Sequence, residues 1–321
     1  MSDGRTSDPD ALFLGVDGGG SKTLAVLVDA DGAERGRGLA GGSNYHVVGL
    51  DAAVTAIQAA VATARNMARR REPLAAAWVG LAGVDRAADA NLLAPRLDTL
   101  AGALRLTNDA ELALSGLPRG VGVALIAGTG SIALGRGADG RFARTSGWGH
   151  LMGDEGSGYD IGQRALRAAA RAADGRGQPT LLLDRILGDW RLSAPEDLFT
   201  SVYGDPDKAR LARLANLVIT CAGEGDVVAR AIIDDAADEL ALAVRTVAAR
   251  LHLPSPVDLA LGGGLLAHET TFRELVLARI RRELAIAAVT LVEEPAAQAA
   301  RWLAQHSAPM PPTGASDPAR D

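Results

Sequence analysis

The sequence predicts an α/β protein of two lobes that share one plan of strands and helices. The 321 residues exceed the roughly 250–300 at which a single hydrophobic core stops growing. Strand and helix patterns alternate from residue 12 to residue 305, and the order β-β-β-α-β-α-β-α occurs twice. We expect lobes over 12–115 and 116–305, the last helix being able to pack back on the first lobe. Residues 1–11 and 306–321 lack periodicity and should be disordered.

The first copy opens with an apolar run, residues 12–17, that ends in three glycines. Two further short strands and the turn at 30–32 indicate an antiparallel meander. A long Ala-rich stretch then places Val54, Ile57, Val61 and Ala64 on one helical face. Strands are expected at 12–17, 24–29, 36–40, 75–81 and 104–107, and helices at 50–71 (ended by Pro73), 86–100 and from Asp109.

The second copy repeats this opening, because an apolar strand again runs into a glycine-rich turn and a returning strand. It then carries additional helices before its last two strands. Strands are expected at 121–127, 132–136, 142–145, 258–261 and 289–291, and helices at 155–173, 208–221, 226–251, 270–284 and from Pro295.

Composition and charge exclude several classes of protein. A hydrophobic content of 48% excludes disorder over the whole length, and a net charge of −6 lacks the basic footprint of a nucleic-acid binder. Cys221 is the single cysteine, so neither a disulfide within the chain nor a cysteine-ligated metal cluster can form. No apolar run approaches the roughly 18 residues of a membrane span, and the polar first ten residues resemble no secretory signal. We expect a cytoplasmic protein.

Three glycine-rich turns follow three of the expected strands, at 17–23, 127–131 and 262–264. Glycine allows successive backbone N–H groups to point at an anion. Any one of these turns alone is ordinary hairpin chemistry. Two hairpins of the same design, each with Ser or Thr, favour a pair of phosphate-binding turns.

Two familiar nucleotide motifs do not explain these turns. Gly15 and Gly20 have the spacing of a P-loop, but Ser21 separates Gly20 from Lys22 and a strand follows. The segment from Gly128 to Ala133 formally matches the dinucleotide fingerprint G-x-G-x-x-A. A returning strand again follows it, so no helix N-terminus is available for a pyrophosphate.

Together with two other segments, these three turns resemble the sugar kinase/actin/Hsp70 superfamily, and within it the N-acetylglucosamine kinase and BadF/BadG ATPase-like family. The matching segments are GVDGGGSKT at 15–23, TNDA at 107–110, AGTGS at 127–131, GWGHLMGDEGSG at 147–158 and LGGG at 261–264. They occur in the family's order and span most of residues 12–305. The resemblance implies two actin-like (ribonuclease H-like) ATPase lobes around a central cleft.

The resemblance also implies where ATP and Mg²⁺ would bind. Asp17, at the end of the first strand, would hold Mg²⁺ directly or through water, since this ion prefers few carboxylates and several waters. A turn-capping role is the alternative for Asp17. Ser21 stands where the family usually has Thr, and an exposed hairpin position is the alternative for Lys22. The ATP-binding residues implied are Gly18, Gly19, Gly20, Ser21, Lys22, Thr129, Gly130, Ser131, Gly262, Gly263 and Gly264.

A carboxylate that accepts the proton of an attacking hydroxyl is the remaining requirement of phosphoryl transfer. Asp109 is the candidate base by resemblance, although Asp also caps helices well. Asn44, Gly147, Trp148, Gly149 and Asp154 would contact the sugar. His46 and His150 lie beside these segments, and we interpret both as structural neighbours of the site.

The function implied is ATP-dependent phosphorylation of the 6-hydroxyl of an amino sugar, N-acetylglucosamine first and glucosamine second. The partner would be a small molecule rather than nucleic acid or a membrane, and relatives are often homodimers. A radical-dehydratase-activating ATPase of the same family is one alternative, but its cluster needs cysteines that a single Cys221 does not supply. A non-catalytic sugar sensor is another, but about ten residues before the first strand leave no room for a DNA-binding helix-turn-helix.

Overall fold

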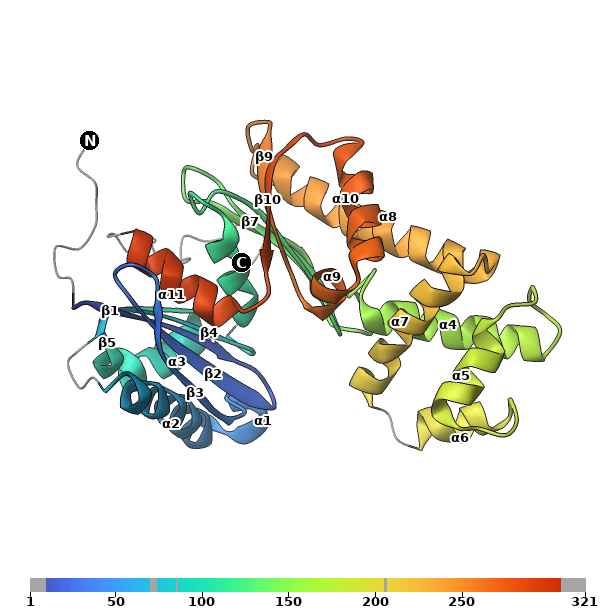
Figure 1. Cartoon of the computed structure of the whole chain (residues 1–321), viewed down its shortest axis with the longest axis horizontal. Coiled ribbons are helices and arrows are strands. Elements are labelled where there is room, and N and C mark those ends of the chain that lie inside the picture. The colour runs from blue at the N-terminus through green and yellow to red at the C-terminus, as the bar shows by residue number, and fades with distance from the viewer. Residues whose placement is uncertain (1–9, 70–73, 85, 205–206, 307–321) are drawn as a thin grey trace. The chain divides into compact units, whose positions relative to one another are not determined.

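The computed structural model describes residues 10–69, 74–84, 86–204 and 207–306, which form two compact units. Unit 1 contains the residues up to Gly122, the segment Arg136–Phe142 and the residues from Glu294 onward; unit 2 contains Val123–Gly135 and Ala143–Glu293. Each unit holds one five-stranded sheet with helices, as the predicted α/β class requires (Figure 1). Most of the two ends expected to be disordered lies outside the described residues. Pro73, at which the helix at 50–71 was expected to end, lies outside them too.

The sheet of unit 1 has the strand order β3-β2-β1-β4-β5. The meander predicted at the start of the chain is confirmed, because β2 pairs antiparallel with both β1 and β3. β4 and β5 then add in parallel, so β1, β4 and β5 all end at the same edge. The bounds are β1 Leu12–Gly18, β2 Lys22–Asp29, β3 Glu34–Gly41, β4 Leu74–Leu81 and β5 Ala101–Thr107.

Helices α2 and α11 pack closely on the sheet of unit 1. A Cβ at Gly15 of β1 would collide with the carbonyl of Ala296 in α11, so glycine is what lets this helix approach. α2 buries Val54, Ile57, Val61 and Ala64, the face that the periodicity predicted. The helices of this unit are α1 Tyr45–Val48, α2 Leu50–Ala68, α3 Ala87–Leu97, the 3₁₀ turns η1 Asp98–Leu100 and η2 Asp109–Gly116, and α11 Pro295–Gln305.

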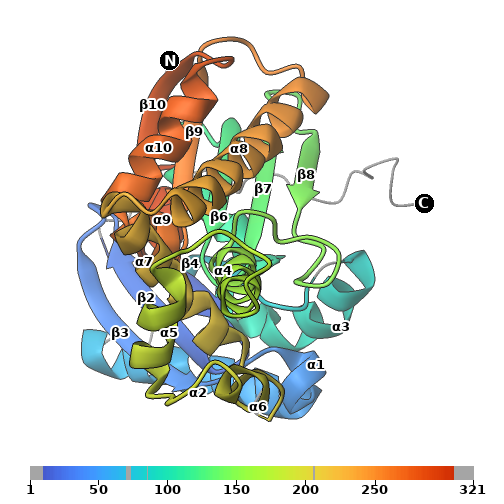
Figure 2. The ribbon, with the colours of Figure 1, turned by 90° about the vertical axis from the view of Figure 1, so that its right-hand side faces the viewer.

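The sheet of unit 2 has the order β10-β9-β6-β7-β8, and helices α8 and α10 lie side by side in both ribbon views (Figures 1 and 2). Its core is aliphatic, with Ile161, Leu214, Val218 and Leu240 all buried. The strands are β6 Gly122–Ala127, β7 Ser131–Arg136, β8 Phe142–Ser146, β9 Val257–Gly262 and β10 Ile286–Val292. The helices are α4 Gly158–Ala173, α5 Leu182–Trp190, α6 Asp197–Tyr203, α7 Lys208–Gly223, α8 Val227–Arg250, α9 Gly264–His268 and α10 Thr270–Arg281.

Helix α4 begins at Gly158, three residues later than the sequence indicated. Asp154 and Gly156 have the positive φ angles of 61° and 74°, so residues 154–156 cannot continue a right-handed helix. Ser157 then caps the helix, its side chain accepting a hydrogen bond from the Asp160 amide. The displaced start leaves Asp154 in a loop of its own.

Four short helices, α1, α5, α6 and α9, were not predicted individually. Helices this short are marginal without tertiary support, so local patterns report them poorly. The Asp226 carboxylate supplies such support at the start of α5, since it accepts hydrogen bonds from the Leu181 amide at 2.5 Å and the Thr180 hydroxyl at 2.7 Å. Leu181 lies 45 residues before Asp226 in the sequence, and Thr180 lies 46 residues before it.

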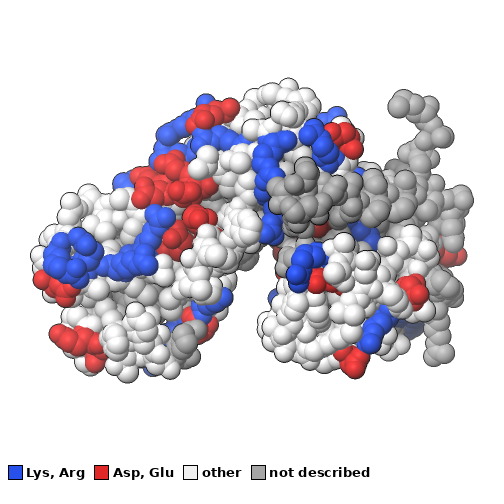
Figure 3. All heavy atoms as spheres, turned by 180° about the vertical axis from the view of Figure 1, so that it is seen from behind, with Lys and Arg blue, Asp and Glu red and all other residues white. Residues whose placement is uncertain are grey.

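Basic and acidic side chains are interspersed over the face shown in Figure 3, in keeping with the small net charge. Arg37 of β3 shows how they pair within unit 1. Its guanidinium contacts both Glu34 and Glu294, at 2.9 and 2.7 Å, and thereby ties β3 to the residue that precedes α11. Among the described residues, no helix is both long and apolar enough to cross a membrane.

Candidate functional site

Residues predicted to act together lie at one edge of the sheet in unit 1. Asp17 of β1 is the register partner of Gly80 in β4, and Gly80 is the register partner of Thr107 in β5. Asp109 follows two residues after Thr107, at the start of η2. The carboxyl ends of parallel strands form the usual ligand-binding edge of such a sheet. The fold therefore brings the candidate metal ligand and the candidate base to the same edge.

The turn between β1 and β2 is braced by the residues that follow β3. The carbonyl oxygen of Gly19 accepts hydrogen bonds from the amides of Ser43 and Asn44, at 2.9 and 3.1 Å. The buried Thr23 hydroxyl lies 2.9 Å from the Ser43 hydroxyl. A Cβ at Gly18 would collide with Ser43, so this close packing requires glycine. The turn is thus a rigid backbone loop with Gly20 and Ser21 exposed to solvent.

Asp17 is a partly buried carboxylate at the base of this turn. Burial raises its pKa above the ordinary value, and the charge of Lys22 acts in the opposite direction. Lys22 itself is exposed on β2. No hydrogen bond to the Asp17 carboxylate is found within the described part of the chain, so its oxygens are available to a cation.

Asp109 is held at the first turn of η2. Asn108 is the N-cap residue of this turn, and its side-chain oxygen accepts a hydrogen bond from the Ala110 amide at 2.9 Å. One oxygen of Asp109 also accepts from that amide, at 2.9 Å. Helix capping was the alternative role predicted for Asp109. In the structure Asn108 and Asp109 both accept a hydrogen bond from the Ala110 amide, so they share this role.

Asn44 connects the sugar-contact prediction to the glycine turn of unit 1. Its amide donates to Gly19, and its side-chain oxygen accepts from the His46 amide at 3.1 Å. The ring of His46 lies 3.2 Å from the carbonyl oxygen of Gly83. Asn44 thus lies directly against the Gly18–Ser21 turn, with His46 packed behind it.

Two glycine turns of unit 2 meet the start of α4. A Cβ at Gly128 would stand 3.5 Å from the Gly264 amide nitrogen, and one at Gly263 would collide with the carbonyl of Ala127. The Gly158 amide donates to the carbonyl oxygen of Gly128 at 2.8 Å. The turn at 127–131, the turn at 262–264 and a helix N-terminus therefore form one cluster of backbone groups.

Asp154 lies against this cluster. Its carboxylate lies close enough to the Ser131 amide for that amide to lower its pKa, and a Cβ at Gly130 would stand only 3.0 Å from its Oδ2 atom. Burial raises the pKa of Asp154, while the Ser131 amide, His150 and Lys208 lower it. The Ser131 hydroxyl donates instead to the carbonyl of Glu155 at 2.7 Å. Ser131 thus uses its amide and its hydroxyl to hold the 154–155 loop.

The segment 147–149 presents an aromatic ring to solvent. Gly147 and Gly149 have φ angles of 69° and 80°, which only glycine adopts readily. Trp148 between them is 63% exposed, and the Arg144 guanidinium lies 5.3 Å from its ring centre. Trp148 was predicted to lie outside the hydrophobic core and to contact the sugar. Its exposure shows that it lies outside the core.

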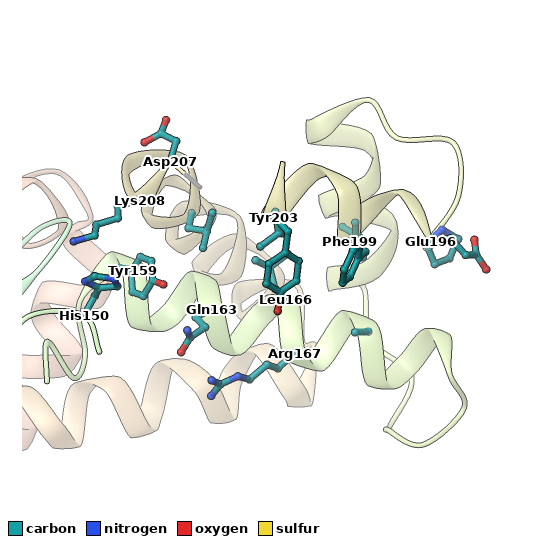
Figure 4. A pocket seen from close by; sticks show the side chains of 15 residues that line it. His150, Tyr159, Gln163, Leu166, Arg167, Glu196, Phe199, Tyr203, Asp207 and Lys208 are labelled. Atoms are coloured by element: carbon teal, nitrogen blue, oxygen red, sulfur yellow. The ribbon is translucent and has the colours of Figure 1, made fainter. Parts of the chain in front are cut away.

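A cavity of about 540 Å³ lies beside this loop, within unit 2 (Figure 4). His150 and Lys208 stand at one end of it, near Tyr159, and aromatic side chains of α6 line its middle. His150 and Lys208 are also the two cationic groups that lower the pKa of Asp154, so this end of the cavity adjoins that carboxylate.

The structure brings together, within unit 1, the Gly18–Ser21 turn, Asp17, Asn44 and Asp109. Within unit 2 it brings together Thr129–Ser131, Gly262–Gly264 and Asp154, with Trp148 in the same loop as Asp154. Sequence reasoning missed Lys208, Thr23 and Ser43. Lys208 could have been noticed because it is one of only two lysines in the chain. Nothing in the sequence indicates the buried contact between Thr23 and Ser43.

The chain is similar to known proteins over most of its length. The model of the BadF/BadG/BcrA/BcrD ATPase family matches residues 14–296. The N-acetylmuramic acid/N-acetylglucosamine kinase of Clostridium acetobutylicum is 36% identical over 259 residues, which cover 79% of this chain and 85% of that protein. The N-acetyl-D-glucosamine kinase of Dictyostelium discoideum is 35% identical over 257 residues, covering 75% and 81%.

Solved structures share the fold. A structure assigned as an N-acetylglucosamine kinase from Chromobacterium violaceum has a TM-score of 0.69 at 26% identity and covers 93% of this chain and 100% of that one. A ROK-family glucokinase from Streptomyces griseus, with glucose and a nucleotide analogue bound, has a TM-score of 0.52 at 21% identity, with 90% and 98% covered. The two-lobed actin-like class predicted from the sequence is confirmed.

Proposed function

The chain belongs to the BadF/BadG/BcrA/BcrD ATPase family, and we propose that it is a kinase that transfers the γ-phosphoryl group of ATP to the 6-hydroxyl of an amino sugar. N-acetylglucosamine is the first candidate substrate, because both curated relatives that share at least 35% identity are named for it. The observation that carries the proposal is the register line from Asp17 through Gly80 to Thr107, which brings two carboxylates and a glycine turn to one sheet edge.

Backbone amides of the glycine turns are the candidate ligands for the phosphates of ATP. In unit 1 these are the amides around Gly18–Ser21, with the Ser21 hydroxyl and the exposed Lys22 beside them. In unit 2 they are the amides around Thr129–Ser131 and Gly262–Gly264. The close packing of these turns supports this role. Amides that are already held in place do not have to be ordered when an anion binds.

Asp17 would bind Mg²⁺, directly or through water. The fit rests on its carboxylate, which is partly buried at the base of the phosphate turn and whose pKa burial raises. A cation there would offset the cost of burying a negative charge. The metal would neutralise charge on the transferring phosphate, as in other phosphoryl transfers.

Asp109 would accept the proton of the sugar's 6-hydroxyl. As this oxygen forms its bond to the γ-phosphorus, the bond from that phosphorus to the β–γ bridging oxygen breaks, and ADP leaves. The proton moves from the hydroxyl to the Asp109 carboxylate. Its position at the start of η2 supports this role, because one oxygen is bound to the Ala110 amide and the carboxylate is thereby oriented.

The candidate sugar contacts are Asn44 in unit 1 and, in unit 2, Asp154 with the segment Gly147–Gly149. A carboxylate can accept hydrogen bonds from two sugar hydroxyls, and the exposed indole of Trp148 offers an apolar face. We expect a homodimer in solution, and a light-scattering mass of about twice the 33.0 kDa chain would bear this out.

A coupled ADP-release assay tests the proposal. The sugars to be compared are N-acetylglucosamine, glucosamine, N-acetylmannosamine, N-acetylmuramic acid and glucose. Stimulation by N-acetylglucosamine above all others supports the first candidate, and stimulation chiefly by glucosamine supports a glucosamine kinase. ATP hydrolysis that does not depend on sugar would instead favour an activating ATPase. The absence of both hydrolysis and phosphoryl transfer would favour a sugar sensor.

A further inference from the structure

A chain of two hydrogen bonds leads from the buried Trp78 in β4 to the peptide before Asp109. The Trp78 indole Nε1 donates to the Thr107 hydroxyl oxygen at 3.0 Å. The same hydroxyl donates its proton to the carbonyl oxygen of Asn108, at 3.0 Å. Trp78 is fully buried and Thr107 is 3% exposed, so water does not compete for the bond between them. The one hydroxyl proton of Thr107 is thus committed to the backbone next to Asp109.

The indole that begins this chain is itself held from two sides. The Arg105 guanidinium lies 4.2 Å from the Trp78 ring centre. The edge of Trp302 in α11 contacts it, with ring centres 5.9 Å apart and planes at 79°. Trp302 in turn stacks on His306 at 4.0 Å. These contacts fix the ring plane, and with it the direction of the N–H group that reaches Thr107.

A second tie follows Asp109. The Arg105 side chain, only 6% exposed, pairs with Glu111 of η2 at 3.5 Å between the charged atoms. Burial lowers the pKa of Arg105 to about 10, and Glu111 acts in the opposite direction. Arg105 therefore contacts both the ring that begins the hydrogen-bond chain and the residue two positions after Asp109. The peptide carrying Asp109 is anchored on both of its sides.

We propose that Trp78 and Thr107 are positioning residues for Asp109, acting through the Asn108 carbonyl to hold the carboxylate in line with the sugar hydroxyl. This inference rests on the proposed role of Asp109 as the base. The 3₁₀ turn η2 has poorer hydrogen-bond geometry than an α-helix and needs such external support. A shift of about 1 Å in a reacting group costs roughly 100-fold in rate, so the anchoring bears directly on turnover.

The test compares Thr107→Val, Thr107→Ser and Trp78→Phe by steady-state kinetics. Valine keeps the branched shape and loses the hydroxyl, and serine keeps the hydroxyl. Phenylalanine stays aromatic but loses the N–H donor together with part of the ring volume. We expect kcat to fall about 10- to 100-fold in Thr107→Val and Trp78→Phe, with sugar and ATP KM within about twofold of wild type. Thr107→Ser should restore kcat to within a few fold of wild type.

Thr55→Val is the matched control, because the Thr55 hydroxyl also donates to a backbone carbonyl, that of Asp51, but on exposed α2. It should leave kcat and KM unchanged. All variants are assayed well below their unfolding midpoints, so that a loss of stability is separated from a loss of rate. Wild-type kcat in folded Thr107→Val and Trp78→Phe would overturn the proposal, as would a serine variant as slow as the valine variant.

Asp109→Asn separates this inference from the function on which it rests. If Asp109 is the base, Asp109→Asn loses turnover, and adding Thr107→Val to it costs nothing further, since the group to be positioned is gone. Near-normal turnover in Asp109→Asn would overturn the base assignment and the positioning role with it. A full additional loss in the double variant would overturn the positioning role alone.

Discussion

The Asp154 carboxylate lies beside the backbone amide of Ser131, which lowers its pKa, so the 147–158 loop meets the glycine turn of unit 2. The Ser131 hydroxyl strengthens the link by donating to Glu155 at 2.7 Å. One loop is predicted to bind sugar and the other to bind phosphate. Because the two loops are in direct contact, a substitution at Asp154 can change the KM for the sugar and the KM for ATP. Which of the two changes depends on the side chain that replaces the carboxylate.

Asp154→Ala should raise the sugar KM far more than the ATP KM, by about 10-fold or more, since it removes a hydrogen-bonded charged group. Asp154→Asn keeps an acceptor for the Ser131 amide. It should therefore preserve the ATP KM fully while still weakening sugar binding. Initial rates over both substrates check this, and an equal rise in both KM values would contradict the assignment of Asp154 to the sugar.

Asp109→Asn should fold normally and lose about 100- to 10,000-fold in kcat, the usual contribution of a general base. The asparagine side chain keeps an oxygen for the Ala110 amide, so η2 should remain intact. Isothermal titration with the sugar should show binding like that of wild type. Turnover close to the wild-type rate would rule out Asp109 as the base.

Gly18→Ala should destabilise the protein and abolish kinase activity. A Cβ there would collide with Ser43 and Leu81, both packed against the turn. Gly20→Ala is the matched control for folding, because nothing lies within 4 Å of a Cβ at that position. Thermal unfolding should show a midpoint several degrees lower for Gly18→Ala than for Gly20→Ala. Equal midpoints would show that the turn is looser than the structure has it.

Asp17→Asn should raise the unfolding midpoint at neutral pH while it removes activity. Burial raises the pKa of Asp17 in the folded state, so its ionised form costs stability once the pH exceeds the unfolded value of about 4. Below that value the carboxyl is protonated in both states and the cost vanishes. Unfolding followed by circular dichroism without metal, at about pH 7.5 and about pH 3, should show a stabilised variant only at the higher pH. A variant less stable than wild type at neutral pH would contradict the assignment.

Local patterns predicted most strands and the long helices, because each is decided by its own residues. The face of α2 carrying Val54 and Ile57 is one case, and the glycines ending β1 are another. The start of α4 was displaced because Asp154 and Gly156 are left-handed, in a loop that packs against Ser131 from 23 residues before Asp154. Helix α5 was missed for a related reason, since Asp226 of a later segment supports its first turn.

The candidate site could be predicted in its residue types but not in its supporting contacts. The parallel-strand rule and the family motifs point to Asp17 and Asp109 without a structure. Neither indicates that Thr107 lies on the register line of Asp17, nor that Trp78 reaches the Thr107 hydroxyl. Such links depend on strand register and ring orientation, which the sequence around each residue does not specify.

The most direct test of the central claim is ADP release with N-acetylglucosamine and with its 6-deoxy analogue, each assayed on wild type and on Asp109→Asn. The proposed transfer predicts rapid ADP release for wild type with N-acetylglucosamine, near-background release with the 6-deoxy sugar, and near-background release for the variant with either. Equal ADP release with both sugars on wild type would contradict transfer to the 6-hydroxyl.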